Sequence, residues 1–101
     1  MSRFALIVTV EFEPELKEEI LLALLAHRER CLKDEPGTLQ FEVLVPFDEP
    51  GKLMLFELYA DAAAFAAHSE GSSLAQYRVE ARPMITRVTS KKCSLGNDVS
   101  A

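Results

Sequence analysis

Two short segments in the middle of the chain alternate in side-chain character and are joined by a turn sequence. They are TLQFEVLVP, residues 38–46, and LMLFELYA, residues 53–60. Successive side chains of a β-strand point to opposite faces of its sheet, so alternation of this kind is typical of strands. The linking FDEPGK carries the Asp, Pro and Gly that turns favour. The pattern predicts an antiparallel β-hairpin, which restricts how the rest of the chain can fold.

A strand and a helix are expected before the hairpin. In residues 3–12, RFALIVTVEF, the even positions are all apolar and the odd positions are mixed, which indicates a strand covered on both faces. Pro14 suits the first turn of a helix, and the glutamates around it favour a helix N-terminus. Apolar residues then recur at helical spacing until about Asp34, and Pro36 with Gly37 ends the helix.

A second helical region and a last strand are expected after the hairpin. Asp61 is a suitable N-cap for an alanine-rich helix over 62–69. After a glycine, the capping-box sequence SLAQ that starts at Ser73 predicts a short helix over 74–81. Pro83 opens the last strand, PMITRVTSKK, at a position that tolerates a missing amide.

The predicted element order, β-α-β-β-α-β, is that of an α+β, ferredoxin-like fold. Such a fold has a four-stranded antiparallel sheet with helices on one face. A chain of 101 residues has the common size of one domain, so we expect a single domain over residues 1–93. Residues 94–101 offer no core position, and we expect them to form a disordered C-terminal tail.

The sheet face opposite the helices is predicted to be too apolar for water. We expect this face to carry Ile7, Leu44, Leu53, Leu55, Tyr59 and Ile85. An apolar surface of this size is typical of an interface. Two sheets packed face to face about a two-fold axis would bury it, so the sequence predicts a homodimer.

Charge and hydropathy argue against nucleic-acid and membrane partners. The net charge is −5, and neither half of the chain concentrates basic residues. No segment reaches the roughly 18 consecutive apolar residues of a membrane span. The N-terminal segment lacks the cleavage site of a signal peptide, so we expect a cytoplasmic protein.

The cysteines and histidines form no recognisable metal motif in the sequence. Cys31 and Cys93 are far apart and neither belongs to a C-x-x-C pair, which favours two reduced thiols. With the two histidines they show no zinc-ligand spacing, so we expect no metal site. We expect His27 to be structural or interfacial, and Cys31 to be an inert core residue.

Three segments together resemble the antibiotic biosynthesis monooxygenase domain. They are EPGTLQFEVL after the first helix, LMLFELYAD on the return strand and AAAFAAH in the next helix. The resemblance covers about residues 3–93. It implies a dimeric α+β barrel, and many members of that family oxygenate their substrates without flavin, metal or haem. On this basis we expect no cofactor.

The resemblance also implies roles for particular residues. His68 matches a histidine that ends the first short helix in the quinol-monooxygenase-like and autoinducer-processing branches. Glu57 and Tyr59 match the Glu-x-aromatic pair on the preceding strand. A second histidine that these branches often carry is absent, and Ser73 stands in its place. Haem-degrading members use a histidine on the second short helix, where this chain has Tyr77, so haem binding is not expected.

Cofactor-free oxygenation needs a base and a dry pocket for a flat substrate. Imidazole, with an ordinary pKa near 6.5, is a base at neutral pH, so His68 is predicted to be catalytic. Tyr77, on the inner stripe of the next helix, is predicted to be the second catalytic group by orienting a substrate oxygen. The predicted substrate-binding residues are Phe65, Tyr59, Glu57 and Thr9.

Some of these residues also allow a structural interpretation. Glu57 and Arg87 are predicted on the mixed sheet face, where they would form a buried ion pair at the dimer contact. Tyr59 and Thr9 would share that face and line the barrel between the two sheets.

Three functions remain open at this point. The first is a cofactor-independent monooxygenase that uses dioxygen on a small quinol, phenolic or polyketide-like substrate. The second is an isomerase or degradative enzyme for a small hydroxy-carbonyl or sugar-phosphate metabolite, whose anion would need Arg78, Arg82, Arg87 or Lys52. The third is a non-catalytic dimeric ligand-binding or stress-response protein, which the missing second histidine keeps open.

Overall fold

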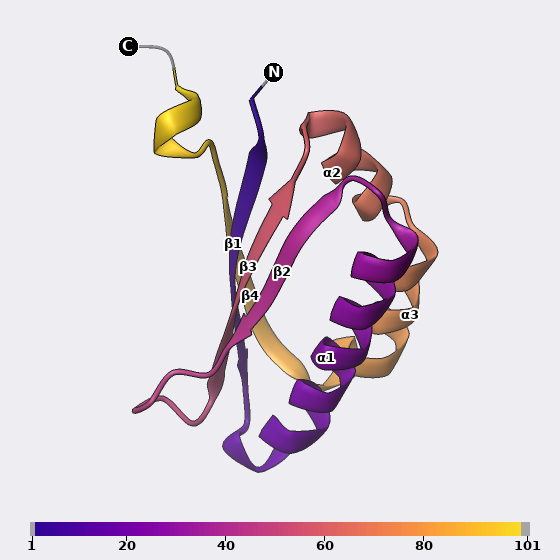
Figure 1. Ribbon diagram of the computed structural model, residues 1–101. Helices are drawn as coiled ribbons and strands as arrows, with labels where there is room; N and C mark the ends of the chain where they lie inside the picture. The colour runs from indigo at the N-terminus through magenta and orange to yellow at the C-terminus, as the bar shows by residue number, and fades with distance from the viewer. Residues whose placement is uncertain (1, 100–101) are drawn as a thin grey trace.

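The computed structural model describes residues 2–99, and its helices cover one face of one antiparallel sheet (Figure 1). The strands are β1 (Phe4–Phe12), β2 (Thr38–Leu44), β3 (Lys52–Tyr59) and β4 (Ile85–Cys93). The helices are α1 (Lys17–Asp34), α2 (Ala62–Ser69) and α3 (Ser72–Ala81). Short 3-10 helices occupy Pro14–Leu16, Arg82–Met84 and Gly96–Asp98, so Pro83 precedes β4 and does not open it.

The strands lie in the order β2-β3-β1-β4, and each neighbouring pair is antiparallel. The β2–β3 hairpin forms as predicted. Each helical connection crosses over one strand, from β1 past β3 to β2 and from β3 past β1 to β4. This arrangement confirms the predicted α+β, ferredoxin-like fold.

The strand register corrects the predicted faces of the sheet. Val8 of β1 pairs with Leu55 of β3, so the even positions of β1 share the helix-covered face with the odd positions of β3. Four residues expected on the opposite face are therefore buried against the helices: Leu53, Leu55, Tyr59 and Ile85. The prediction was wrong because β3 is apolar on both faces, and its alternation does not say which face is inside.

The face without helices carries other residues. Ile7 is 40% exposed and Leu44 is 48% exposed, and half-buried Met54 and Phe56 lie between them in the register. Thr9, which pairs with Met54, is also on this face. The predicted shared face of Thr9 and Tyr59 is therefore wrong.

The predicted ion pair between Glu57 and Arg87 is also wrong. Glu57 is buried on the helix-covered face, whereas Arg87 pairs with Glu11 on the other face at 3.8 Å between Nε and Oε2. The two residues lie on opposite sides of the sheet.

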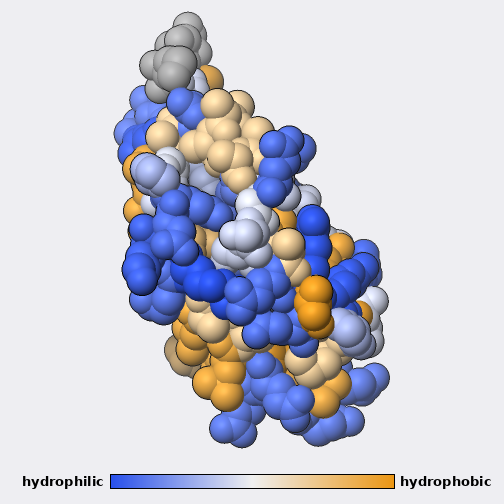
Figure 2. Space-filling model, turned by 90° about the vertical axis from the view of Figure 1, so that its right-hand side faces the viewer, coloured by the Kyte–Doolittle hydropathy of each residue, from blue (hydrophilic) through white to orange (hydrophobic). Residues whose placement is uncertain are grey.

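The core lies between the sheet and the helices. Ile20 and Leu24 of α1 are completely buried, as are Val10, Phe41 and Leu53 of the sheet. Burial of each such side chain contributes about 1.5–3 kcal/mol, which fixes α1 across the sheet. The outer side of the helices is mainly hydrophilic, with an apolar patch at the level of α2 (Figure 2). Among residues 2–99, no helix is both long enough and apolar enough to cross a bilayer.

Residues 94–99 do not form the disordered tail that we expected. A 3-10 helix at Gly96–Asp98 brings the Asp98 carboxylate to Arg3, just before β1. It accepts hydrogen bonds from Nε and Nη2 of Arg3, each at 3.0 Å, and from the Arg3 backbone amide at 3.1 Å. The apolar pattern gave no sign of this ion pair. Residues 100 and 101 lie outside the described residues.

A close approach at Gly37 holds the loop after α1 against α2. A Cβ added at Gly37 would overlap the Cβ of Ala64, and the Gly37 carbonyl accepts a hydrogen bond from the Ala60 amide at 2.9 Å. The loop that starts at Glu35 is therefore seated on the helix that ends near His68.

We expect Gly37→Ala to lower the free energy of unfolding by about 1–3 kcal/mol, because the added methyl group must push the loop away from α2. Urea denaturation measures this change. Gly96→Ala is the matched control, since no atom lies within 4 Å of a Cβ at Gly96, and its effect should stay within about 0.5 kcal/mol. Equal losses in the two variants would show that the close approach does not matter.

Candidate functional site

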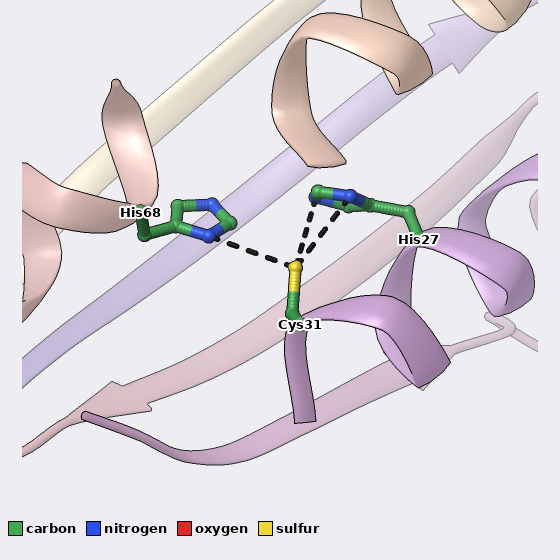
Figure 3. A group of neighbouring side chains, drawn as sticks. All are labelled: His27, Cys31 and His68. Carbon is green, nitrogen blue, oxygen red and sulfur yellow. Dashed lines mark hydrogen bonds between the residues drawn. The ribbon is translucent and has the colours of Figure 1, made fainter. Parts of the chain in front are cut away.

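A group of polar side chains meets inside the protein where α1 and α2 end near one another. Figure 3 shows His27 and Cys31 on α1 and His68 on α2 facing a common centre. All three side chains are buried. Such a group is unusual in an interior and needs internal hydrogen bonds to be stable.

His68 is placed by α2 and oriented by Glu35. The Asp61 carboxylate accepts a hydrogen bond from the Ala64 amide at 2.8 Å and caps α2, as predicted. His68, in the last turn, is 4% exposed, and its Nδ1 lies 2.9 Å from Oε1 of Glu35. A carboxylate only accepts hydrogen bonds, so Nδ1 donates and the neutral ring keeps its lone pair on Nε2.

Glu57 lies beside the other nitrogen of His68. Its Oε1 is 3.7 Å from Nε2 of His68 and accepts a hydrogen bond from the Tyr59 hydroxyl. Burial raises the pKa of Glu57 above its ordinary value, against the opposing effects of the Tyr59 hydrogen bond and the His68 charge. Burial also raises the pKa of Tyr59, so this phenol stays protonated and donates.

A cavity of about 330 Å³ lies between the sheet and the helices α2 and α3. Four predicted site residues line it, namely His68, Tyr77, Phe65 and Glu57. Tyr59 is buried next to Glu57, and Thr9 lies on the far side of the sheet, away from the cavity. The remaining lining residues are Leu6, Val8, Val10, Leu55, Ser69, Leu74, Arg78, Arg82, Ile85, Val88 and Ser90.

Tyr77, which lines this cavity, has a buried hydroxyl without a hydrogen-bond partner in the part of the chain that the structure describes. Burial raises the pKa of Tyr77 to about 12, although the nearby Arg82 charge opposes this. A buried polar group without a partner costs about 1–3 kcal/mol, and a polar ligand atom in the cavity would relieve that cost.

His27 is held by Ser73. Nδ1 of His27 lies 2.8 Å from Oγ of Ser73, which also accepts a hydrogen bond from Nε of Arg30 at 3.0 Å. Burial, reinforced by the charge of His68, lowers the pKa of His27 to about 4, so this imidazole is neutral at pH 7. Its ring stacks on Tyr77 with the centroids 5.0 Å apart.

The role of Ser73 differs from the capping box that the sequence predicted. Gly71 is the N-cap of α3, and no side chain caps this helix. Ser73 lies inside the first turn and is buried, with its hydroxyl bound to His27 and Arg30. The Ser73 hydroxyl therefore bonds to residues of α1 and does not cap α3 as the sequence pattern predicted.

Two members of the site were missed in the sequence. His27 and Cys31 are four residues apart on α1, a spacing that places side chains on one helix face, and α2 adds His68 to them. Their ligand atoms lie within 4.8 Å of one another, a proximity that their spacing along the sequence did not indicate. Glu35 was missed as well, because its sequence position indicated only the end of a helix and not a contact with His68.

Sequence comparison identifies the family of this protein. Residues 3–79 match the family described as Antibiotic biosynthesis monooxygenase. The chain belongs to the antibiotic biosynthesis monooxygenase family. The resemblance in the sequence is thereby confirmed, and membership supports a monooxygenase-type function. Among the curated proteins, no sequence is similar enough to count as a match.

Solved structures of similar proteins agree with this family's fold. A candidate antibiotic biosynthesis monooxygenase from Caulobacter crescentus is 18% identical, with a TM-score of 0.87 over 99% of this chain and 92% of its own. Rv0793 from Mycobacterium tuberculosis is 23% identical, with a TM-score of 0.85 over 98% and 100% of the two chains. A candidate family member from Nitrosomonas europaea is 23% identical, with a TM-score of 0.82 over 94% and 89%.

We expect one of the two imidazoles, His27, to titrate near pH 4 in an NMR titration, because burial disfavours its charged form. The unfolded chain takes up this proton near pH 6.5, so the free energy of unfolding should fall as the pH decreases from about 6.5 to 4. The total loss should be at most about 3 kcal/mol.

His27→Gln should remove one imidazole signal and make this pH dependence shallower. An imidazole signal of His27 that titrates near pH 6.5 in the wild type would contradict the effect of burial.

Proposed function

We propose that the protein is a cofactor-independent monooxygenase that uses dioxygen on a small quinol, phenolic or polyketide-like substrate. The observation that carries this proposal is a single apolar cavity lined by both His68 and Tyr77, with the Tyr77 hydroxyl lacking a partner among residues 2–99. Membership of the monooxygenase family supports the reaction class. The substrate class and the independence from cofactors are our inference.

The cavity has the size and lining of a site for a small flat molecule. Its volume of about 330 Å³ is at the lower end of the range for ligand pockets, roughly 300–1,000 Å³. Val8, Val10 and Leu55 of the sheet and Phe65 of α2 supply apolar walls. Such walls favour an aromatic ring and exclude the water that would compete for its oxygen atoms.

His68 is suited to remove the substrate's hydroxyl proton. Because Glu35 accepts a hydrogen bond from the N–H group at Nδ1, the Nε2 lone pair can receive a proton from a phenol or quinol. The imidazolium that forms is stabilised by the Glu35 carboxylate, as in other carboxylate–histidine pairs. Glu57, 3.7 Å from Nε2, lies on the same side of the ring.

Tyr77 and two arginines are suited to stabilise the resulting oxyanion. The Tyr77 hydroxyl would donate a hydrogen bond to the substrate oxygen and so gain the partner that it lacks. Arg78 and Arg82 line the same cavity and add positive charge. Donors fixed before the reaction stabilise a developing charge most effectively.

The deprotonated substrate would supply all the electrons for the reaction. One electron passes to dioxygen, the two radicals combine to form a carbon–oxygen bond, and the O–O bond then breaks. One oxygen atom remains in the product and the other leaves as water, while a quinol becomes a hydroxyquinone. The reaction therefore needs no external reductant. The protein has to bind the substrate, remove its proton and exclude water from the cavity.

We expect His68→Gln to reduce dioxygen uptake with hydroquinones by about 10²–10⁴-fold, because it removes the base. Tyr77→Phe should reduce uptake less, by about 10–100-fold, because one donor to the oxyanion is lost. An oxygen electrode with a panel of hydroquinones measures both effects. Gln76→Ala is the control on α3, since Gln76 is exposed beside Tyr77 and should leave the rate unchanged.

The assay tests the role of His68 as the base separately from the oxygenase activity of the protein. Full activity in His68→Gln would disprove the role of His68 but leave the oxygenase in place. Absence of uptake with every quinol in the wild type would contradict the proposed function and favour a ligand-binding protein.

A second candidate function has support from the two arginines of the cavity. An anionic hydroxy-carbonyl metabolite, such as a sugar phosphate, would need positive charge, and Arg78 and Arg82 are placed to supply it. Of the other cations considered for this role, Lys52 pairs with Glu49 at 2.8 Å, and Arg87 lies on the other sheet face. A rise in melting temperature with a sugar phosphate, without dioxygen uptake, would favour this candidate.

We also propose that the protein forms a homodimer through the sheet face without helices. Ile7 and Leu44 are exposed there, and Met54 and Phe56 lie between them. A second copy is the occupant that this face suits best, because a two-fold axis pairs the same apolar strip with itself.

We expect Ile7→Lys to weaken the dimer at least about tenfold, because it places a charge in an apolar contact. Analytical ultracentrifugation over a range of concentrations measures the dissociation constant. Leu22→Lys is the control, since Leu22 is 63% exposed on α1. A monomeric wild type, or equal weakening in both variants, would contradict this interface.

A further inference from the structure

We propose that His27, Cys31 and His68 form an internal binding site for a borderline divalent transition-metal ion, for which Zn²⁺ is the natural example. The three residues come from two helices that are distant in sequence, and each is less than 5% exposed. Imidazole and thiolate are the ligands that zinc prefers in proteins.

The distances within the cluster fit a tetrahedral ion. Sγ of Cys31 lies 3.6 Å from Nδ1 and 3.7 Å from Nε2 of His27, and 3.7 Å from Nδ1 of His68. Ligand bonds of 2.3 Å to sulfur and about 2.0–2.1 Å to nitrogen place these atoms about 3.6 Å apart around tetrahedral zinc. The sulfur–nitrogen edges of the site are therefore already at the required length.

The third edge of the site joins the two imidazoles. The ligand atoms of His27, Cys31 and His68 all lie within 4.8 Å of one another. Nε2 of His27 is the nitrogen available to an ion, because Nδ1 is paired with the Ser73 hydroxyl at 2.8 Å. The imidazole of His27 is neutral, as a ligand must be.

Glu35 lies beside the site, next to one of its three ligands. Its Oε1 lies 2.9 Å from Nδ1 of His68, so the carboxylate is already next to one ligand nitrogen. When the ion replaces the proton on Nδ1, the carboxylate can bind the ion in place of that proton. The carboxylate and the Cys31 thiolate then offset the charge of the ion.

A second hollow leads from solvent toward the cluster. It has a volume of about 390 Å³ and is lined by exposed Asp34 and Pro36 as well as by Glu35 and buried Ser73. Ser73 touches His27 and Cys31, and Glu35 touches His68, so two residues of its wall separate the hollow from the cluster. It lies apart from the apolar cavity, because the two have no lining residue in common. A metal site needs such an entry path, and the acidic residues here attract a cation.

Metal binding would change what His68 presents to the apolar cavity. An ion on Nδ1 leaves the proton of the neutral ring on Nε2, so His68 would offer a donor to the cavity and no lone pair. His68 could therefore not bind the ion and remove a proton from the substrate at the same time. This consequence rests on the proposed function, whereas the metal site does not.

Titration of the full chain with Co²⁺ tests the site directly, because a cobalt–thiolate bond produces an intense charge-transfer absorption band. We expect one equivalent to produce the band and Zn²⁺ to remove it by displacement. Cys31→Ala should abolish the band and weaken Zn²⁺ binding by more than about 100-fold, beyond the loss typical of a residue that only supports a ligand. Cys93→Ser, at the end of β4, is the matched control and should keep both.

X-ray absorption of the zinc-loaded wild type tests the ligand set without a variant, should Cys31→Ala fail to fold. One sulfur at about 2.3 Å with nitrogen and oxygen ligands at about 2.0–2.2 Å is expected. A shell of oxygen atoms alone would mean adventitious binding to surface carboxylates and would overturn the proposal. A band that survives in Cys31→Ala, or is lost in Cys93→Ser, would overturn it as well.

Dioxygen uptake measured during zinc titration tests the consequence for His68. Uptake should decrease in step with occupancy of the site and return when a chelator removes the ion. Full uptake at full occupancy would overturn the exclusion between ion and base, while the binding measurements stand independently.

Discussion

The hydrogen bond between Glu35 and His68 joins the end of α1 to the end of α2, and the geometry of the site depends on it. It fixes the proton of the neutral ring on Nδ1 and leaves the lone pair on Nε2, the nitrogen near Glu57. A charge-assisted hydrogen bond of this kind in a largely buried site is stronger than one between neutral groups.

The packing between the two helices makes the bond possible. Small residues let the loop after α1 approach α2. Gly37 has no side chain, and Ala64 of the alanine-rich helix α2 is its neighbour. The Thr38 hydroxyl donates to Oε1 of Glu35 at 2.8 Å and holds the carboxylate in place. A larger residue at Gly37 would separate the loop from α2. Because the loop carries Glu35 and α2 carries His68, the packing at Gly37 also determines the geometry of the site.

The fold could be predicted from the sequence because local patterns and topology agree. The alternating strands, the Asp61 cap and the turn between β2 and β3 all act within a few residues, and each formed as expected. The faces of β3 could not be predicted, since both are apolar and only pairing with β1 decides between them. Of the pair Thr9 and Tyr59, Thr9 lies on the face opposite the helices, as predicted, and only the assignment of Tyr59 to that face was wrong.

The site was only partly predictable because its members depend on contacts between distant elements. His68 and Tyr77 could be found from helical spacing, which directs both toward the sheet. Glu35 and Ser73 could not be found, because each has a local role in sequence, as a helix end or a cap, that differs from its partner in space. The tail was missed because an ion pair with Arg3, not an apolar contact, holds it.

The two imidazoles of the interior have different environments, and this difference separates their chemistry. His27 has a serine hydroxyl as its partner and the Arg30 charge nearby, so burial keeps it neutral. His68 has a carboxyl group on each side, Glu35 at Nδ1 and Glu57 near Nε2, and it lines the apolar cavity. Cys31 contacts both rings, so the metal ion that we propose would join the two imidazoles through its thiolate.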